Sequence, residues 1–187
     1  GRQLRHLVDV VGYAATRRGH DAADIAALDH LTTGPAALGL PAGVDVRWLG
    51  VAGFALSHED TTILIDPYVS RLGLGDLVRR RVVGADLAAI DRYVPRADAV
   101  LVGHTHFDHA LDVPAIARRD GCRVYGGTSA RNLLGLHGLA ERAVEVEPHR
   151  TYEIGPFEVT FVPSLHAKLA LGLAVPNGGE LTCDHVD

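Results

Sequence analysis

The sequence of 187 residues contains no methionine, two cysteines and few aromatic residues, which make up 5% of the chain. Without a methionine, residue 1 is not a translational start, so we expect the sequence to be part of a longer or processed chain. Two cysteines are too few for a disulfide framework, which predicts a reducing, cytoplasmic location. No run of about 20 apolar residues occurs, and the sequence therefore predicts no membrane span.

Basic residues are fewer than acidic ones, 18 lysines and arginines against 23 aspartates and glutamates, so the formal net charge is -5. Apolar residues make up 47% and charged residues 22%, which permits one globular domain with a sizeable core. We interpret the basic run Arg79-Arg80-Arg81 as a solvated helix face. The acidic balance argues against a nucleic-acid partner and leaves a small-molecule substrate as the expected one.

The hydrophobic pattern divides the chain near residue 42. Leu4, Leu7 and Val8 follow helical spacing, so residues 1–41 are predicted to form an N-terminal helical extension and a linker. From Val44 onward the apolar period changes to two, which is typical of a strand with one wet face. Residues 42–187 are therefore predicted to form an α/β domain.

Short apolar runs and turn residues predict the elements of this domain. Strands are expected at residues 44–48, 54–57, 61–65, 99–102, 123–125, 143–147 and 151–163. Helices are expected around residues 87–94, 111–119 and 128–136, the last one capped by Thr128 or Ser129. The last two strands are expected to be consecutive and antiparallel.

The residues with the strongest chemical signal are His104-x-His106-x-Asp108-His109, which follow the buried strand at 99–102. His104 and His106 are two residues apart, so in extended backbone both rings point to one side and can share one metal at ~2.0 Å per bond. Asp108 and His109 are placed to bind a second ion, because two-metal hydrolases use ion separations of ~3.5–4 Å. Such a cluster is costly unless a metal compensates it.

This motif and the short apolar strand before it resemble the metallo-β-lactamase fold superfamily, and the resemblance covers about residues 44–187. It implies an α/β fold of the αββα sandwich type, of which this chain covers mainly the N-terminal part. Asp66, at the end of Ile63-Leu64-Ile65-Asp66-Pro67, matches the first acidic position of the family and is expected to support the metal loop. His166 matches the third histidine of the first metal site.

The resemblance implies hydrolysis by a hydroxide held on one or two zinc ions. Three neutral histidines, His104, His106 and His166, leave Zn²⁺ its full charge, and water bound to it then has a pKa near ~7. Asp108 is the expected catalytic residue, which orients this hydroxide and protonates the leaving group. A glutamate usually stands at position 106 in the iron-containing redox branch, so histidine favours zinc, with manganese and iron left open.

Two ligands that the family implies, a bridging Asp or Cys and a final His, have no counterpart here. Asp184 and His185 are expected to form a loop over the site rather than to bind the metal. The domain is thus expected to be incomplete at its C-terminus and unable to hold a second ion tightly by itself. The missing half, or a second copy in a homo-oligomer, would cover an apolar sheet face that includes Val46, Trp48, Phe157 and Phe161.

Within the superfamily, the segments 46–50, 53–54 and 66–68 resemble the branch of L-ascorbate-6-phosphate lactonase and N-acyl-phosphatidylethanolamine phospholipase D. This resemblance implies a lactone, ester or phosphodiester substrate. Two alternatives share the same motif: a nuclease of the tRNA-processing type, which needs a basic groove, and a true β-lactamase, for which no secretion signal is seen. A third alternative is a non-catalytic metal-binding protein or an inactive fragment.

Overall fold

The computed structural model describes residues 8, 12, 39–72 and 83–164. The chain divides into two compact units, one formed by residues 1–42 and 165–177 and the other by residues 43–164 and 178–187. The fold below is that of the second unit. Apart from the helical residues 8 and 12, the predicted N-terminal helices lie outside the described residues, as do the run Arg79–Arg81 and the site residues His166, Asp184 and His185.

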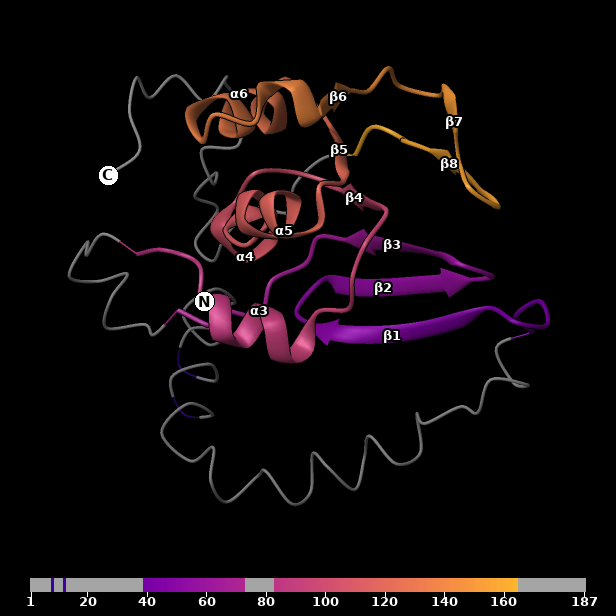
Figure 1. Cartoon of the computed structure of the whole chain (residues 1–187). Helices are drawn as coiled ribbons and strands as arrows, with labels where there is room; N and C mark the ends of the chain where they lie inside the picture. The colour runs from indigo at the N-terminus through magenta and orange to yellow at the C-terminus, as the bar shows by residue number, and fades with distance from the viewer. Residues whose placement is uncertain (1–7, 9–11, 13–38, 73–82, 165–187) are drawn as a thin grey trace. The chain divides into compact units, whose positions relative to one another are not determined.

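A six-stranded sheet with the strand order β1-β2-β3-β4-β5-β6 forms the centre of this unit (Figure 1). Its strands are β1 (Asp45–Gly50), β2 (Gly53–His58), β3 (Thr61–Ile65), β4 (Ala99–Leu101), β5 (Arg123–Gly126) and β6 (Ala143–Glu145). β1, β2 and β3 form an antiparallel meander, whereas β3, β4, β5 and β6 are parallel neighbours. The predicted hairpin of β2 and β3 is confirmed, and its turn is formed by Glu59 and Asp60.

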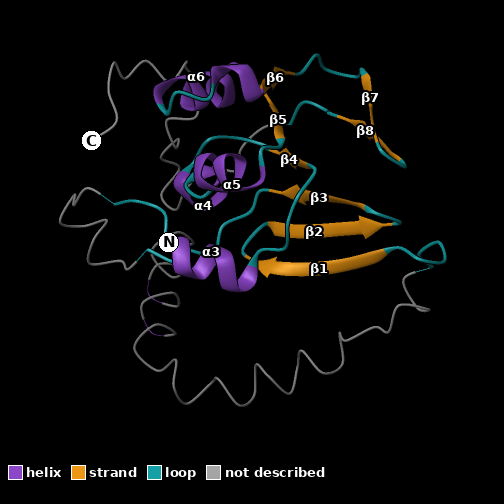
Figure 2. Ribbon diagram, viewed as in Figure 1, coloured by secondary structure: helices purple, strands orange, loops and turns teal. Residues whose placement is uncertain are grey.

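Helices pack on one face of the sheet (Figure 2). They are α3 (Leu87–Tyr93), α4 (Phe107–Ala110), α5 (Val113–Asp120) and α6 (Thr128–Leu136), followed by a short 3-10 helix at Ala140–Arg142. The core on this face joins the fully buried strand residues Leu64 and Val100 to the helix residues Ile90, Ile116 and Leu134. No helix in the described ranges is long and apolar enough to cross a membrane.

A second, two-stranded sheet of β7 (Thr151–Ile154) and β8 (Phe157–Thr160) packs on the opposite face. Successive residues of a strand point to opposite faces, so the neighbours of Leu64 and Val100 point away from the helices. Ile63, Ala99 and Leu101 accordingly form a second apolar cluster with Ile154. The layers are helix, sheet and the beginning of a second sheet, which is the first part of an αββα arrangement.

The pairing predicted for the C-terminal strands was wrong. β6 pairs in parallel with β5 in the large sheet and does not pair with β7. Residues 151–163, predicted as one strand, instead form the hairpin of β7 and β8, which turns at Gly155 and Pro156. Gly155 has a φ of 54°, a left-handed conformation that glycine adopts readily, so Gly-Pro is a turn signal that outweighs the apolar alternation around it.

Two helix starts also differ from prediction. The helix expected from Leu111 begins at Val113 as α5, with Asp112 as its N-cap, and a separate short helix, α4, precedes it at Phe107–Ala110. The N-cap of α6 is Gly127, and the hydroxyl of Thr128 donates instead to Glu145 Oε1 at 2.5 Å. Because the Thr128 hydroxyl bonds to a residue of β6, it does not cap its own helix.

The apolar face predicted to be uncovered is exposed only in part. Val46, Trp48 and Phe54 are 37%, 66% and 37% exposed, and their cross-strand pairs place them on the same face as Ile63. The prediction was wrong for Phe157 and Phe161, which are half-buried because they belong to the segment that covers this face. The exposed apolar surface therefore lies on β1 and β2.

Cys122 precedes β5 and is 5% exposed. Burial raises the pKa of its thiol to about 11, and the nearby Asp120 carboxylate acts in the same direction. Only the thiolate reacts with disulfide reagents, so at pH 8 roughly one thiol in a thousand is reactive in the native state. In a Cys183→Ser background, we expect 5,5′-dithiobis(2-nitrobenzoic acid) to react at least ~100-fold faster in guanidinium chloride than in buffer, because unfolding restores a pKa near ~8.5. Equal rates would contradict the buried thiol.

Candidate metal centre

The candidate metal ligands meet at one edge of the large sheet because β3 and β4 are parallel neighbours. Asp66 follows β3 directly, and residues 103–109 follow β4. The amide of Asp66 donates to Leu101 O at 2.9 Å, which extends the pairing of the two strands to their carboxyl ends. The strand order thus brings Asp66 to the His-x-His-x-Asp-His segment although 37 residues separate it from Gly103.

His104 and His106 form the first donor pair. Their nearest nitrogens, His104 Nε2 and His106 Nδ1, are 3.0 Å apart, and their ring centroids are 4.5 Å apart. Two nitrogens that bind one tetrahedral zinc ion at ~2.0–2.1 Å are separated by roughly 3.3 Å. The spacing of these two nitrogens fits a shared ion.

Asp108 and His109 form the second pair on the short helix α4. His109 Nδ1 is 2.9 Å from Asp66 Oδ2, and a carboxylate oxygen accepts hydrogen bonds, so Nδ1 is the donating nitrogen of this pair. This tautomer leaves the lone pair of His109 on Nε2, which is 3.8 Å from Asp108 Oδ2. A nitrogen and a carboxylate oxygen in this arrangement fit two ligands of a second ion.

The two pairs are adjacent, since the ring centroids of His104 and His109 are 3.9 Å apart. Within residues 39–72 and 83–164, no three histidine, cysteine or acidic side chains converge on one metal position. The described residues therefore supply two half-sites. His166, predicted as the third ligand of the first ion, and the loop residues Asp184 and His185 lie beyond residue 164.

Asp66 is held in an unusual backbone conformation. It is 8% exposed and has a φ of 43°, in the left-handed region that non-glycine residues seldom occupy. Its Oδ1 accepts the Gly103 amide at 2.7 Å while Oδ2 accepts from His109. Both oxygens thus contact the segment that carries the candidate ligands, which are the contacts expected of a carboxylate that supports a metal loop.

Replacing Asp66 by alanine should weaken metal retention by ~10–100-fold, the usual loss when the carboxylate behind a ligand histidine is removed. Asp66→Asn should be nearly as harmful although its shape is preserved. Its amide donates toward His109 Nδ1 and so forces the proton onto Nε2, the nitrogen needed for the ion. Metal content after dialysis, measured by mass spectrometry, checks both variants.

Asp98→Asn is the matched control, because Asp98 accepts the Thr62 amide at 2.8 Å at the opposite end of β3. It should retain the ion as the unmodified chain does. Equal metal content in all three variants would show that Asp66 only ends its strand.

Sequence reasoning missed a fully buried carboxylate, Asp112, three residues after His109. Its Oδ2 accepts the amides of Val69 and Ser70 at 2.6 and 3.0 Å. The signal was the position of Asp112 before Val113 and Pro114, which is typical of a helix start. Because the sequence predicts one helix over residues 111–119, it places this aspartate inside the helix and not at a helix start.

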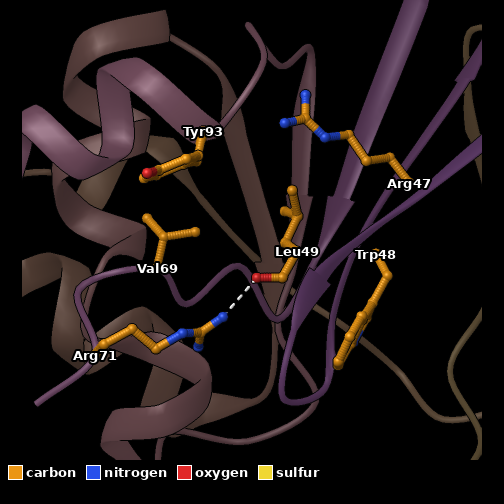
Figure 3. Close-up of a pocket in the computed structure, with 6 residues that line it drawn as sticks. All are labelled: Arg47, Trp48, Leu49, Val69, Arg71 and Tyr93. Carbon is orange, nitrogen blue, oxygen red and sulfur yellow. Dashed lines mark hydrogen bonds between the residues drawn. The ribbon is translucent and has the colours of Figure 1, made fainter. Parts of the chain in front are cut away.

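A separate hollow of about 260 Å³ lies where β1 ends (Figure 3). It is lined by Arg47, Trp48, Leu49, Val69, Arg71 and Tyr93. The guanidinium of Arg71 donates to Leu49 O at 2.6 Å and to Tyr68 O at 2.7 Å, so it joins the end of β1 to the segment that follows β3. Of the candidate metal ligands that the structure describes, none lines this hollow.

The family model described as the beta-lactamase superfamily domain matches residues 61–182, and the chain therefore belongs to this superfamily. This match and the sheet topology confirm the predicted α/β fold of the metallo-β-lactamase type, with the chain covering part of the domain.

Curated relatives extend the comparison. The chain is 32% identical over 125 residues to a UPF0173 metal-dependent hydrolase of Sinorhizobium medicae, which covers 65% of this chain and 47% of the relative. It is 30% identical over 137 residues to another of Polynucleobacter asymbioticus, covering 71% of this chain and 45% of that protein. The chain thus spans about half the length of the curated relatives it matches.

A solved structure of a metallo hydrolase from Ignicoccus hospitalis is also similar, with 19% identity and a TM-score of 0.46. The match covers 70% of this chain and 53% of that chain.

Proposed function

We propose that this chain forms part of a metal-dependent hydrolase that binds zinc at the end of β3 and β4. The observation that carries the proposal is the adjacency of two donor pairs, His104 with His106 and Asp108 with His109, at one sheet edge. His166 is proposed as a further ligand of the first ion on the resemblance alone. A divalent ion held there would lower the pKa of water toward ~7 and polarise the substrate oxygen.

The side chains of this segment have distinct proposed roles. His104 Nε2 and His106 Nδ1 would hold the first ion and His109 Nε2 the second, while Asp66 keeps the His109 ring in place. Asp108 is on the first turn of α4, and its side chain is 36% exposed, so substrate can reach it. Its Oδ2 would accept a proton from the attacking water and return it to the leaving group.

The proposed substrate is a small molecule with a lactone, ester or phosphodiester bond. The curated relatives are described as metal-dependent hydrolases, which supports the reaction type but names no substrate. The sequence resemblance to the lactonase and phospholipase D branch supports the bond type. The net charge of -5 disfavours the nuclease alternative, because a nuclease must attract polyanionic RNA.

The experiment is a metal titration combined with a substrate panel. The chain is freed of metal with a chelator, reloaded with Zn²⁺, Mn²⁺ or Fe²⁺, and assayed on a generic lactone, an aryl ester, bis(p-nitrophenyl) phosphate and a precursor tRNA. Hydrolysis of a small substrate that returns with zinc supports the proposal. Cleavage of the RNA alone would favour the nuclease. Tight metal binding without turnover on any substrate would favour a non-catalytic metal-binding protein or an inactive fragment.

A further inference from the structure

We propose that Asp112 is a positioning residue that sets the hydrogen bond between His109 and Asp66. This inference rests on the proposed function for its consequence, since that hydrogen bond directs His109 Nε2 toward an ion. The effect of Asp112 on the hydrogen bond itself follows from geometry alone, because Asp112 joins the segment that carries Asp66 to the helix pair that carries His109.

The contacts of Asp112 point away from an ordinary capping role. Aspartate at an N-cap normally accepts an amide of its own helix, yet Asp112 makes no such bond with α5. Its Oδ2 accepts the amides of Val69 and Ser70, and its Oδ1 accepts the hydroxyl of Ser70. The carboxylate of Asp112 thus bonds to Val69 and Ser70, which precede it in the chain by 43 and 42 positions.

Burying the carboxylate of Asp112 costs desolvation free energy. It has an exposed fraction of 0%, and no arginine, lysine or histidine of the described residues forms an ion pair with it. A buried carboxylate is tolerated when its oxygens are fully hydrogen-bonded, and three donors from residues 69 and 70 satisfy it. Ser70 Oγ in turn accepts the amide of Asp86 at 2.7 Å, which fixes its orientation.

Asp112 bonds to a segment, residues 66–72, whose backbone conformation requires support from surrounding contacts. Residues 66–72 contain two non-glycine residues in left-handed conformations, Asp66 with a φ of 43° and Arg71 with a φ of 50°. Such conformations persist only where surrounding contacts impose them. Asp112 binds the middle of this segment, and an edge contact of Tyr68 with Phe107, at 6.0 Å between ring centroids, joins it to α4 as well.

One carboxylate therefore connects both partners of the supporting hydrogen bond. Asp66 lies three residues before Val69, and His109 lies three residues before Asp112. If residues 69–70 shift relative to α4, the 2.9 Å separation of Asp66 Oδ2 and His109 Nδ1 changes with them. Metal-binding side chains must be held to within ~0.5 Å, so a small shift is enough to lose a ligand.

Asp112→Asn in the full chain tests this inference. The substitution keeps the size of the side chain but places an amide nitrogen or a neutral oxygen where two backbone amides now donate. In the metal-free protein, we expect long-range ¹H–¹⁵N spectra of the imidazoles to lose the ordered Nδ1-protonated signal of His109. After reloading with Co²⁺ or Zn²⁺, the ion bound by His109 should be retained ~10–100-fold less tightly, as when Asp66 itself is replaced.

Asp120→Asn is the matched control at the other end of α5. The side chain of Asp120 is 1% exposed and accepts the Ala97 amide at 3.0 Å, so it too holds a distant segment against α5. This variant should lower the unfolding temperature, yet keep the His109 signal and the metal affinity. A merely structural role for Asp112 would make the two variants alike.

An Asp112→Asn chain that retains the His109 signal and the ion would overturn the inference. If Asp112→Asn does not fold, Ser70→Ala decides, because it removes only the hydroxyl donor: a weakened His109 signal supports the inference and an unchanged one refutes it. If the unmodified chain binds no metal, the proposed function fails, while the spectra of the metal-free variants still decide whether Asp112 sets the hydrogen bond.

Discussion

His106→Ala should remove the first ion and reduce metal-dependent hydrolysis by more than ~100-fold. Removing a ligand must cost more than removing the carboxylate behind one, for which ~10–100-fold is usual. Nδ1 of His106 is 3.0 Å from Nε2 of His104, a spacing at which the two nitrogens could share the proposed first ion. Groups that act as a unit are not additive, and His104→Ala together with His106→Ala should be no worse than either alone.

The measurement is zinc per chain by mass spectrometry, together with hydrolysis of whichever small substrate the panel selects. His149→Asn is the control, because His149 is exposed and has a φ of 64°, which asparagine tolerates. A His106→Ala chain that retains the zinc content of the control would contradict the assignment of the first site. Additive losses in the double variant would show that the two histidines act separately.

Much of the domain was accessible from sequence because its central strands have local signals. Residues 63–65 and 99–102 are short apolar runs that stop at Asp66 and just before Gly103 and His104, and such runs identify buried strands. The C-terminal strands were misassigned because pairing is not a local property. The alternation around Phe157 and Val159 predicts a strand equally well whether its partner is β6 or β7.

The site residues also differ in whether a local sequence signal identifies them. His104, His106, Asp108 and His109 lie within six positions, and their spacing alone predicts metal binding, whereas Asp66 was identified by the resemblance to the superfamily. Asp112 was not recognised, because its role depends on Val69 and Ser70, which only the packing of α5 brings near it. Residue type and periodicity do not distinguish a fully buried aspartate from an exposed one before it is placed in the fold.

The described residues also show why His109 and Asp108 need not act alike. His109 has 16% of its side chain exposed and is oriented by Asp66, so it is held for binding. Asp108 is 36% exposed and approaches another site residue only at 3.8 Å, the distance of its Oδ2 from His109 Nε2. A carboxylate that is less constrained can both contact an ion and exchange a proton with substrate.

Asp108→Asn should therefore lower hydrolysis by ~10²–10⁴-fold, the range of general acid–base catalysis. The amide keeps the size of the side chain and an oxygen that can contact an ion, but it neither accepts nor returns a proton near neutral pH. We expect zinc content to fall far less than the rate does. This separates Asp108 from His106, for which metal and rate should be lost together.

Asp91→Asn is the matched control, since Asp91 is an exposed helical aspartate on α3 that lies 3.6 Å from Arg119 and away from the motif in the sequence. It should leave both zinc content and turnover unchanged. The decisive comparison is turnover per bound zinc in the two variants. If Asp108→Asn loses zinc in proportion to its rate, Asp108 is a ligand with no separate role in proton transfer, and another group must carry the proton to the leaving group.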